Sequence, residues 1–203
     1  MAERPWKRLQ ARTPFGSFRL RLPMGGDMFD RRRFLTVLGG ALLAGSRPGF
    51  AAGSAASRLT ELGISLPTAA APIANYVPFV RTGSLLVVSG QLSAGLQGVL
   101  TGKLGGGVSI EDGQKAARQA AINVLAQIQA ATGDLDKVTR VVRLGGFINC
   151  TPDFADAAKV MNGASDLMVQ VFGDKGRHSR STIGVAALPA NAVVEVEALV
   201  EVA

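Results

Sequence analysis

The chain has 203 residues and a formal net charge of +7, a basic balance that by itself suggests a nucleic-acid or membrane partner. The charge is uneven, because the first 50 residues hold ten cations and three acids, whereas the remainder holds twelve of each. The part after residue 50 is therefore neutral. Nucleic-acid binding depends on a positive surface that releases counterions, so neutrality argues against nucleic acid as the main partner.

Residues 1–51 are predicted to be a basic leader that directs export. The triplet Arg31-Arg32-Arg33 is followed by the apolar run 37–44 and by small residues ending at Ala51-Ala52, an arrangement typical of a signal peptide. A membrane span needs about 20 apolar residues, so this run is too short for one. The paired arginines followed by Phe-Leu resemble a twin-arginine signal, which predicts a periplasmic or otherwise exported protein. The alternatives are a basic tail that targets nothing, or a mis-called start that leaves the protein cytoplasmic.

The first half of the remaining chain predicts an exposed linker over 52–75, followed by two strands and a helix. Residues 76–81 and 85–90 are rich in strand-forming residues and are separated by a short turn. The glycine-rich stretch 95–107 lacks the spacing of a phosphate loop and is interpreted as a flexible connection. A helix is expected from Ser109, with an acidic first turn, to a stop at Gly133.

The second half predicts a long strand over 137–150, a helix that starts at 151–153 and ends at Gly173, and two final strands at 181–188 and 193–202. The resulting order, ββ-α-β-α-ββ, indicates an α+β fold whose two helices cover one face of a sheet. In the last strand Val and Ala alternate with glutamates. The face that the helices leave uncovered is a candidate subunit interface.

The chain has one cysteine, Cys150, and one histidine, His178. A single cysteine permits no intrachain disulfide, and Cys150 is expected to be a buried thiol at a strand end. A single histidine excludes a His-cluster metal site. A Ser-His-Asp triad would need His178, and no nucleophile motif supports one.

Several short motifs follow one another at a family-like spacing, and together they extend from Tyr76 to Val202. They are Asn75-Tyr76-Val77, Val88-Ser89-Gly90-Gln91, Asn123, residues 133–138, Arg180-Ser181-Thr182-Ile183-Gly184-Val185, Leu188-Pro189 and Glu195-Val196-Glu197-Ala198. In this order they resemble the Rid/YjgF family. The resemblance implies a chorismate-mutase-like fold, a homotrimer with active sites between subunits, and hydrolysis of reactive enamines and imines such as 2-aminoacrylate to 2-keto acids and ammonia. It implies no metal or organic cofactor.

The resemblance also assigns site residues within residues 76–203, the expected domain. Arg180 and Glu195 match catalytic positions, and Tyr76, Ser89, Arg180 and Thr182 match substrate-binding positions. Arginine can hold a substrate carboxylate through two parallel hydrogen bonds. Glutamate can orient the attacking water or shuttle a proton. Thr182 stands where many relatives carry cysteine, a difference that bears on substrate preference.

Other interpretations remain open at this stage. Arg180 is alternatively a surface arginine at a strand start, and Arg177 lies three residues upstream as a competing candidate. The protein is alternatively a non-catalytic trimer that binds a small carboxylate or a protein partner. An endoribonuclease, an activity described for some family members, is a third possibility that the neutral domain disfavours.

Overall fold

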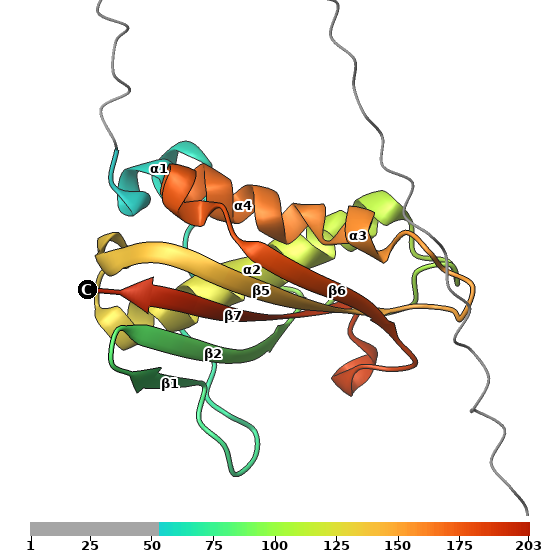
Figure 1. Ribbon diagram of the computed structural model, residues 1–203. Helices are drawn as coiled ribbons and strands as arrows, with labels where there is room; N and C mark the ends of the chain where they lie inside the picture. The colour runs from blue at the N-terminus through green and yellow to red at the C-terminus, as the bar shows by residue number, and fades with distance from the viewer. Residues whose placement is uncertain (1–52) are drawn as a thin grey trace, which may run out of the picture. The chain divides into compact units, whose positions relative to one another are not determined.

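The computed structural model describes residues 53–203, which form one α+β unit (Figure 1). The leader predicted over residues 1–51 lies outside the described residues and stays a prediction. Within the described part, no helix combines the length and apolar character needed to cross a membrane. The helices are α1 (Ala55–Glu61), α2 (Ile110–Thr132), α3 (Ala157–Val160) and α4 (Asn162–Phe172), with 3-10 turns at Leu135–Lys137, Gly173–Gly176 and Pro189–Asn191. The strands are β1 (Phe79–Thr82), β2 (Leu85–Leu92), β3 (Ala94–Gly95), β4 (Gly98–Val99), β5 (Val138–Asn149), β6 (Ser179–Val185) and β7 (Val194–Val202).

The main sheet has five strands in the order β1-β2-β7-β5-β6. All neighbours pair antiparallel except β5 and β6, which are parallel because α3 and α4 carry the chain back between them. Strands β3 and β4 form a separate small hairpin. This arrangement confirms the predicted α+β class and the ββ-α-β-α-ββ order.

Helices α2 and α4 lie on one face of the sheet and enclose the core (Figure 1). In β7 the Val and Ala side chains are buried beneath these helices, while Glu195 and Glu197 lie on the opposite face, as the alternation predicts. The helices approach closely at Gly163 of α4. A Cβ there would overlap the carbonyl oxygen of Gln114 in α2 and lie 2.8 Å from its carbon.

Both predicted ends of α2 are confirmed. The Ser109 hydroxyl accepts a hydrogen bond from the Asp112 amide, and Gly133 ends the helix with φ 74°. The next helix differs from expectation, because a turn closes first through the bond from the Phe154 amide to the Thr151 carbonyl. The helix therefore begins at Ala157 and is divided at Met161 into α3 and α4.

The N-terminal segment is more ordered than the exposed linker predicted over 52–75. Ala55 and Leu59 of α1 are buried in the core, and the Ala55 amide donates to Asp136 Oδ1 at 2.7 Å. The packed domain therefore begins near Ser54, ahead of Tyr76. Similarly, the glycine-rich connection contains part of the β3–β4 hairpin and the fully buried Leu104.

Candidate functional site

The structure places the predicted site residues in two groups, with Arg180 and Thr182 on the helix-covered face of the sheet and Glu195 on the opposite face. Arg180 and Thr182 of β6 pair with Leu144 and Gly146 of β5 and share their helix-covered side. Glu195 of β7 points to the uncovered face, and β5 separates its strand from β6. A single chain therefore does not bring Arg180 and Glu195 together.

The first group is built around the exposed guanidinium of Arg180. Its Nη1 donates to the Ser165 hydroxyl at 3.0 Å, and its Nη2 donates to the Ala158 carbonyl at 2.9 Å. The Ser165 oxygen also lies 3.0 Å from Nε2 of His178. Two of the five guanidinium N–H groups are thus engaged in these contacts, which leaves three for a ligand.

His178 is half-buried beside Arg180, with its Nδ1 at 2.6 Å from the Gly176 carbonyl oxygen. Burial lowers the pKa of the imidazole and the positive charge of Arg180 lowers it further, while the hydrogen bond to Gly176 acts in the opposite direction. Two residues after Arg180, the Thr182 hydroxyl is buried and has no hydrogen-bond partner within residues 53–203.

The second group surrounds the half-buried carboxylate of Glu195. A bulge between Val88 and Gln91 sets Gly90 against it, so that a Cβ at Gly90 would overlap Oε1 and lie 2.7 Å from Cδ. Burial raises the pKa of Glu195, and the neighbouring Glu197 carboxylate raises it further. The result is a desolvated carboxylate that holds its proton more tightly than an exposed one.

Ser89 and Tyr76 are connected to this second group through Gly90, which Ser89 directly precedes and with which Tyr76 shares a cavity. The Ser89 hydroxyl donates to the Val77 carbonyl at 2.8 Å. Tyr76 is 48% exposed and, with Gly90 and Gln91, lines a cavity of about 170 Å³. Gln91 Nε2 donates to the Ser89 and Gly90 carbonyls, which braces the bulge.

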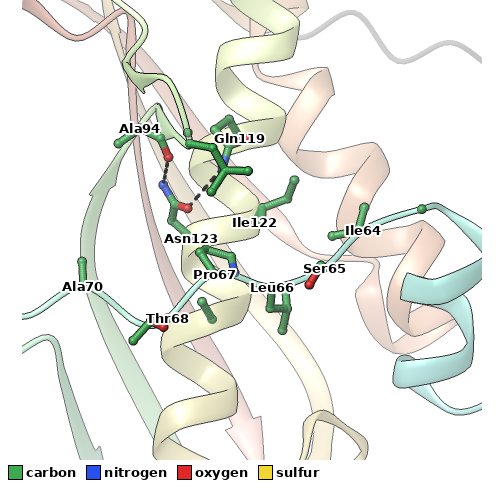
Figure 2. A pocket seen from close by; sticks show the side chains of 14 residues that line it. Ile64, Ser65, Leu66, Pro67, Thr68, Ala70, Ala94, Gln119, Ile122 and Asn123 are labelled. Atoms are coloured by element: carbon green, nitrogen blue, oxygen red, sulfur yellow. Dashed lines mark hydrogen bonds between the residues drawn. The ribbon is translucent and has the colours of Figure 1, made fainter.

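A larger groove of about 540 Å³ lies between α2 and residues 63–70 (Figure 2). Asn123, one of the motif residues, borders it and donates from Nδ2 to the Leu92 and Ala94 carbonyls at 2.9 Å each. Asn123 thereby fixes the end of β2 to α2. Neither Arg180 nor Glu195 lines this groove.

The contact between Ser165 and Arg180 was not anticipated from the sequence. Ser165 has no motif around it and reaches Arg180 only because α4 packs beside β6.

The other chemically reactive or charged candidates lie outside this site. Cys150 is buried, as expected. Arg177 instead pairs with Asp174 at 3.1 Å and is largely exposed. Among residues 53–203 there is no cluster of three His, Cys, Asp or Glu side chains able to ligate a metal ion.

Comparison with known proteins relates the described region to one family. The family model described as "YjgF/chorismate_mutase-like, putative endoribonuclease" matches residues 56–202. The chain is 52% identical over 153 residues to Protein TCP17 of Trypanosoma cruzi, covering 74% of this chain and 96% of the relative. It is 32% identical over 139 residues to the 2-iminobutanoate/2-iminopropanoate deaminase of Dermatophagoides farinae, covering 68% and 93%.

Two solved structures share the fold at substantial sequence identity. One is the protein Atu1372 of unknown function from Agrobacterium tumefaciens, with 46% identity and a TM-score of 0.68 over 73% of this chain and 93% of that one. The other is a "putative endoribonuclease" from Shewanella oneidensis, with 36% identity and a TM-score of 0.71 over 74% and 100%. Because the family match starts at residue 56, it includes α1 in the domain.

Proposed function

The chain belongs to the YjgF/chorismate mutase-like family, and from that premise we propose that it hydrolyses 2-imino acids and their enamine forms to 2-keto acids and ammonia. The observation that carries this proposal is the exposed guanidinium of Arg180, braced at two N–H groups with three left for a carboxylate. The 32% identity to an imine deaminase supports the same substrate class.

The proposed chemistry uses one cation and one carboxylate. Arg180 holds the substrate carboxylate through charge-assisted hydrogen bonds, which leaves the adjacent imine carbon open to attack. Glu195 takes a proton from water as the water oxygen bonds to that carbon. It returns that proton to the imine nitrogen, which gives the neutral carbinolamine. The carboxylate then takes the proton of the carbinolamine hydroxyl and passes it to the nitrogen as the C–N bond breaks and the C=O bond forms, so the products are the keto acid and ammonia. The raised pKa of Glu195 suits it to these proton transfers.

The site requires a second copy of the chain, because Arg180 and Glu195 lie on opposite faces of one sheet. We propose a homotrimer in which the Arg180 of one subunit meets the Glu195 of a neighbour. The uncovered face has the apolar character that an interface needs: Val80 and Ile183 are each 52% exposed and Val87 is 46% exposed. Sedimentation of a stable monomer at micromolar concentration would refute the shared site.

Mixed trimers test the shared site directly. Arg180→Ala and Glu195→Gln alone are each expected to have far less than one quarter of the wild-type activity, but a one-to-one mixture reassembled together should regain about that fraction. That fraction follows because a random quarter of interfaces combine a native Arg180 with a native Glu195. Mixtures that form trimers but recover no activity would refute a site shared between Arg180 of one subunit and Glu195 of a neighbour.

The activity assay measures the ammonia released from imino acids, which an amino-acid oxidase generates in the same reaction mixture. Arg180→Ala should lower kcat/KM by about 30- to 1,000-fold, since it removes charge-assisted bonds worth roughly 2–4 kcal/mol. Arg177→Ala is the matched control, because Arg177 is committed to Asp174. If the control is inactive and Arg180→Ala is active, Arg177 is the binding arginine. A wild-type protein that binds carboxylates but releases no ammonia would support the non-catalytic alternative.

The family model and the Shewanella protein are both described as a "putative endoribonuclease", so RNA binding is a second property to measure. RNA binding is expected to be weak at physiological salt, because the region after residue 50 carries equal numbers of cations and acids. Tight binding that weakens steeply with salt would favour RNA over imino acids.

A further inference from the structure

His178, Ser165 and Arg180 form a chain of hydrogen bonds whose donors can be assigned from chemistry. The Gly176 carbonyl is only an acceptor, so His178 Nδ1 must carry the hydrogen of their 2.6 Å bond. In the neutral ring Nε2 is then an acceptor, and the Ser165 hydroxyl donates to it across 3.0 Å. The remaining lone pairs of Ser165 accept the Nη1–H of Arg180, also at 3.0 Å.

This chain gives each member one defined orientation. A serine hydroxyl alone can rotate and can present either its hydrogen or its lone pairs to a neighbour. With its hydrogen committed to His178, Ser165 presents only an acceptor toward Arg180. The Ala158 carbonyl provides the second acceptor at 2.9 Å. An exposed arginine would otherwise lose considerable rotamer freedom on gripping a ligand.

We propose that Ser165 and His178 are positioning residues, which hold the guanidinium of Arg180 in the orientation that receives a substrate carboxylate. This inference rests on the proposed function of Arg180. Neither residue touches the substrate. Their contribution is preorganisation, so they affect how tightly the carboxylate binds more than how fast the bound substrate reacts.

The surroundings of His178 favour the neutral ring that the chain requires. A protonated ring would make Nε2 a second donor toward the oxygen that already accepts from Arg180. The acidic residues of the neighbouring elements do little to stabilise a protonated ring, because Asp174 in the turn after α4 is paired with Arg177, and Asp156, directly before α3, is paired with Lys159. Lys175 donates to the Val138 carbonyl, and Asp166 on α4 is exposed. Arg180 is the charged group that acts on the ring, and burial with this charge lowers the pKa of His178.

Calorimetric titration of the full chain with 2-oxobutanoate, a keto acid of the product class, tests the inference. Ser165→Ala should weaken binding about 5- to 10-fold, the usual effect of losing one hydrogen bond near a charge. Ser165→Thr keeps the hydroxyl and should recover much of the affinity. In the ammonia assay, Ser165→Ala should raise KM with kcat nearly unchanged. Ser57→Ala is the matched control, because Ser57 is a partly exposed serine of α1 whose hydroxyl bonds only the nearby Ser54 carbonyl.

The outcomes separate the inference from the function on which it rests. If Arg180→Ala loses binding while Ser165→Ala and His178→Phe keep wild-type affinity and KM, the positioning role is wrong and the function stands. If Arg180→Ala binds 2-oxobutanoate as tightly as the wild type, or the wild type does not bind it, the carboxylate site itself is wrong and both proposals fall.

The ring nitrogens give a second, spectroscopic test, because His178 is the only histidine of the 203 residues. Nitrogen-15 spectra of the untagged protein should show a neutral ring with the hydrogen on Nδ1 and an unprotonated Nε2. Adding 2-oxobutanoate should shift the Nε2 resonance in the wild type, and Ser165→Ala should abolish that shift. The opposite tautomer, or an Nε2 resonance that Ser165→Ala leaves unchanged, would overturn the inference.

Discussion

Replacing Gly90 with alanine tests whether the position of the Glu195 carboxylate matters for the reaction. A Cβ at residue 90 would overlap Oε1 of Glu195 and lie 2.7 Å from Cδ. Carbon atoms in contact are normally about 3.5–4.0 Å apart, so the carboxylate must withdraw by roughly 1 Å. A misplacement of about 1 Å can cost about 100-fold in rate. We therefore expect kcat/KM to fall by about two orders of magnitude.

The fold should tolerate this change, because the displaced atoms are the end of a flexible and half-exposed side chain. The thermal midpoint of Gly90→Ala is thus expected to stay close to that of the wild type. Gly95→Ala is the matched control, since a Cβ there would meet Gln119 at an ordinary 3.5 Å. Kinetics of ammonia release and thermal unfolding of both variants give the comparison.

The mechanism of the Gly90→Ala effect can be isolated with a double mutant. If the added methyl acts through Glu195, Gly90→Ala should do little more in a Glu195→Gln background, where the carboxylate is already lost. Full activity of Gly90→Ala, or losses that multiply in the double mutant, would refute the reasoning.

Three further predictions concern stability. Gly163→Ala should unfold about 3–10 °C below the wild type, because its methyl would overlap the α2 backbone and overpacking costs about 1–3 kcal/mol; an unchanged melting temperature would contradict the close helix contact. Glu195→Gln should be more stable than the wild type at neutral pH, because the raised pKa means that the ionised form disfavours folding. That gain should vanish as pH falls toward 4.5, and thermal melts across pH would show a constant difference if burial of Glu195 were irrelevant. The lowered pKa of His178 gives a contribution that is present above pH 6.5 and is lost as pH falls through the folded value, so His178→Phe should flatten the stability profile there.

Local sequence signals predicted the elements that they directly control. Ser109 and Gly133 mark the ends of α2 because a cap needs a hydroxyl acceptor and a stop needs a left-handed residue. The alternation in β7 predicted its buried face because strand geometry alone sets which side chains face the core. By contrast, α1 has only seven residues, and its buried Ala55 and Leu59 become recognisable as core only when the rest of the domain is present.

For the candidate site too, local sequence signals predicted some features and not others. Arg180 and Glu195 were predicted from a motif in the sequence, but their placement on opposite faces depends on strand order. Ser165 and Gly90 contact residues that are remote in sequence, and no local pattern reports such contacts. The position of the β2 bulge determines the contact of Gly90, and the packing of α4 determines the contact of Ser165. Both are properties of the assembled domain.

The place of β6 in the sheet has a consequence for local stability. It is an edge strand, held by parallel pairing to β5 alone, whereas β7 is paired on both sides at the centre. Edge elements with one hydrogen-bonded neighbour open at lower free energy than central ones. Arg180 therefore lies on a part of the sheet that can detach while β2, β7 and β5 stay folded, unless an adjoining subunit covers it. In hydrogen exchange at low protein concentration, the amides of Ser179–Val185 should exchange before those of Val194–Val202, so the proposed carboxylate binding would be lost well before the fold.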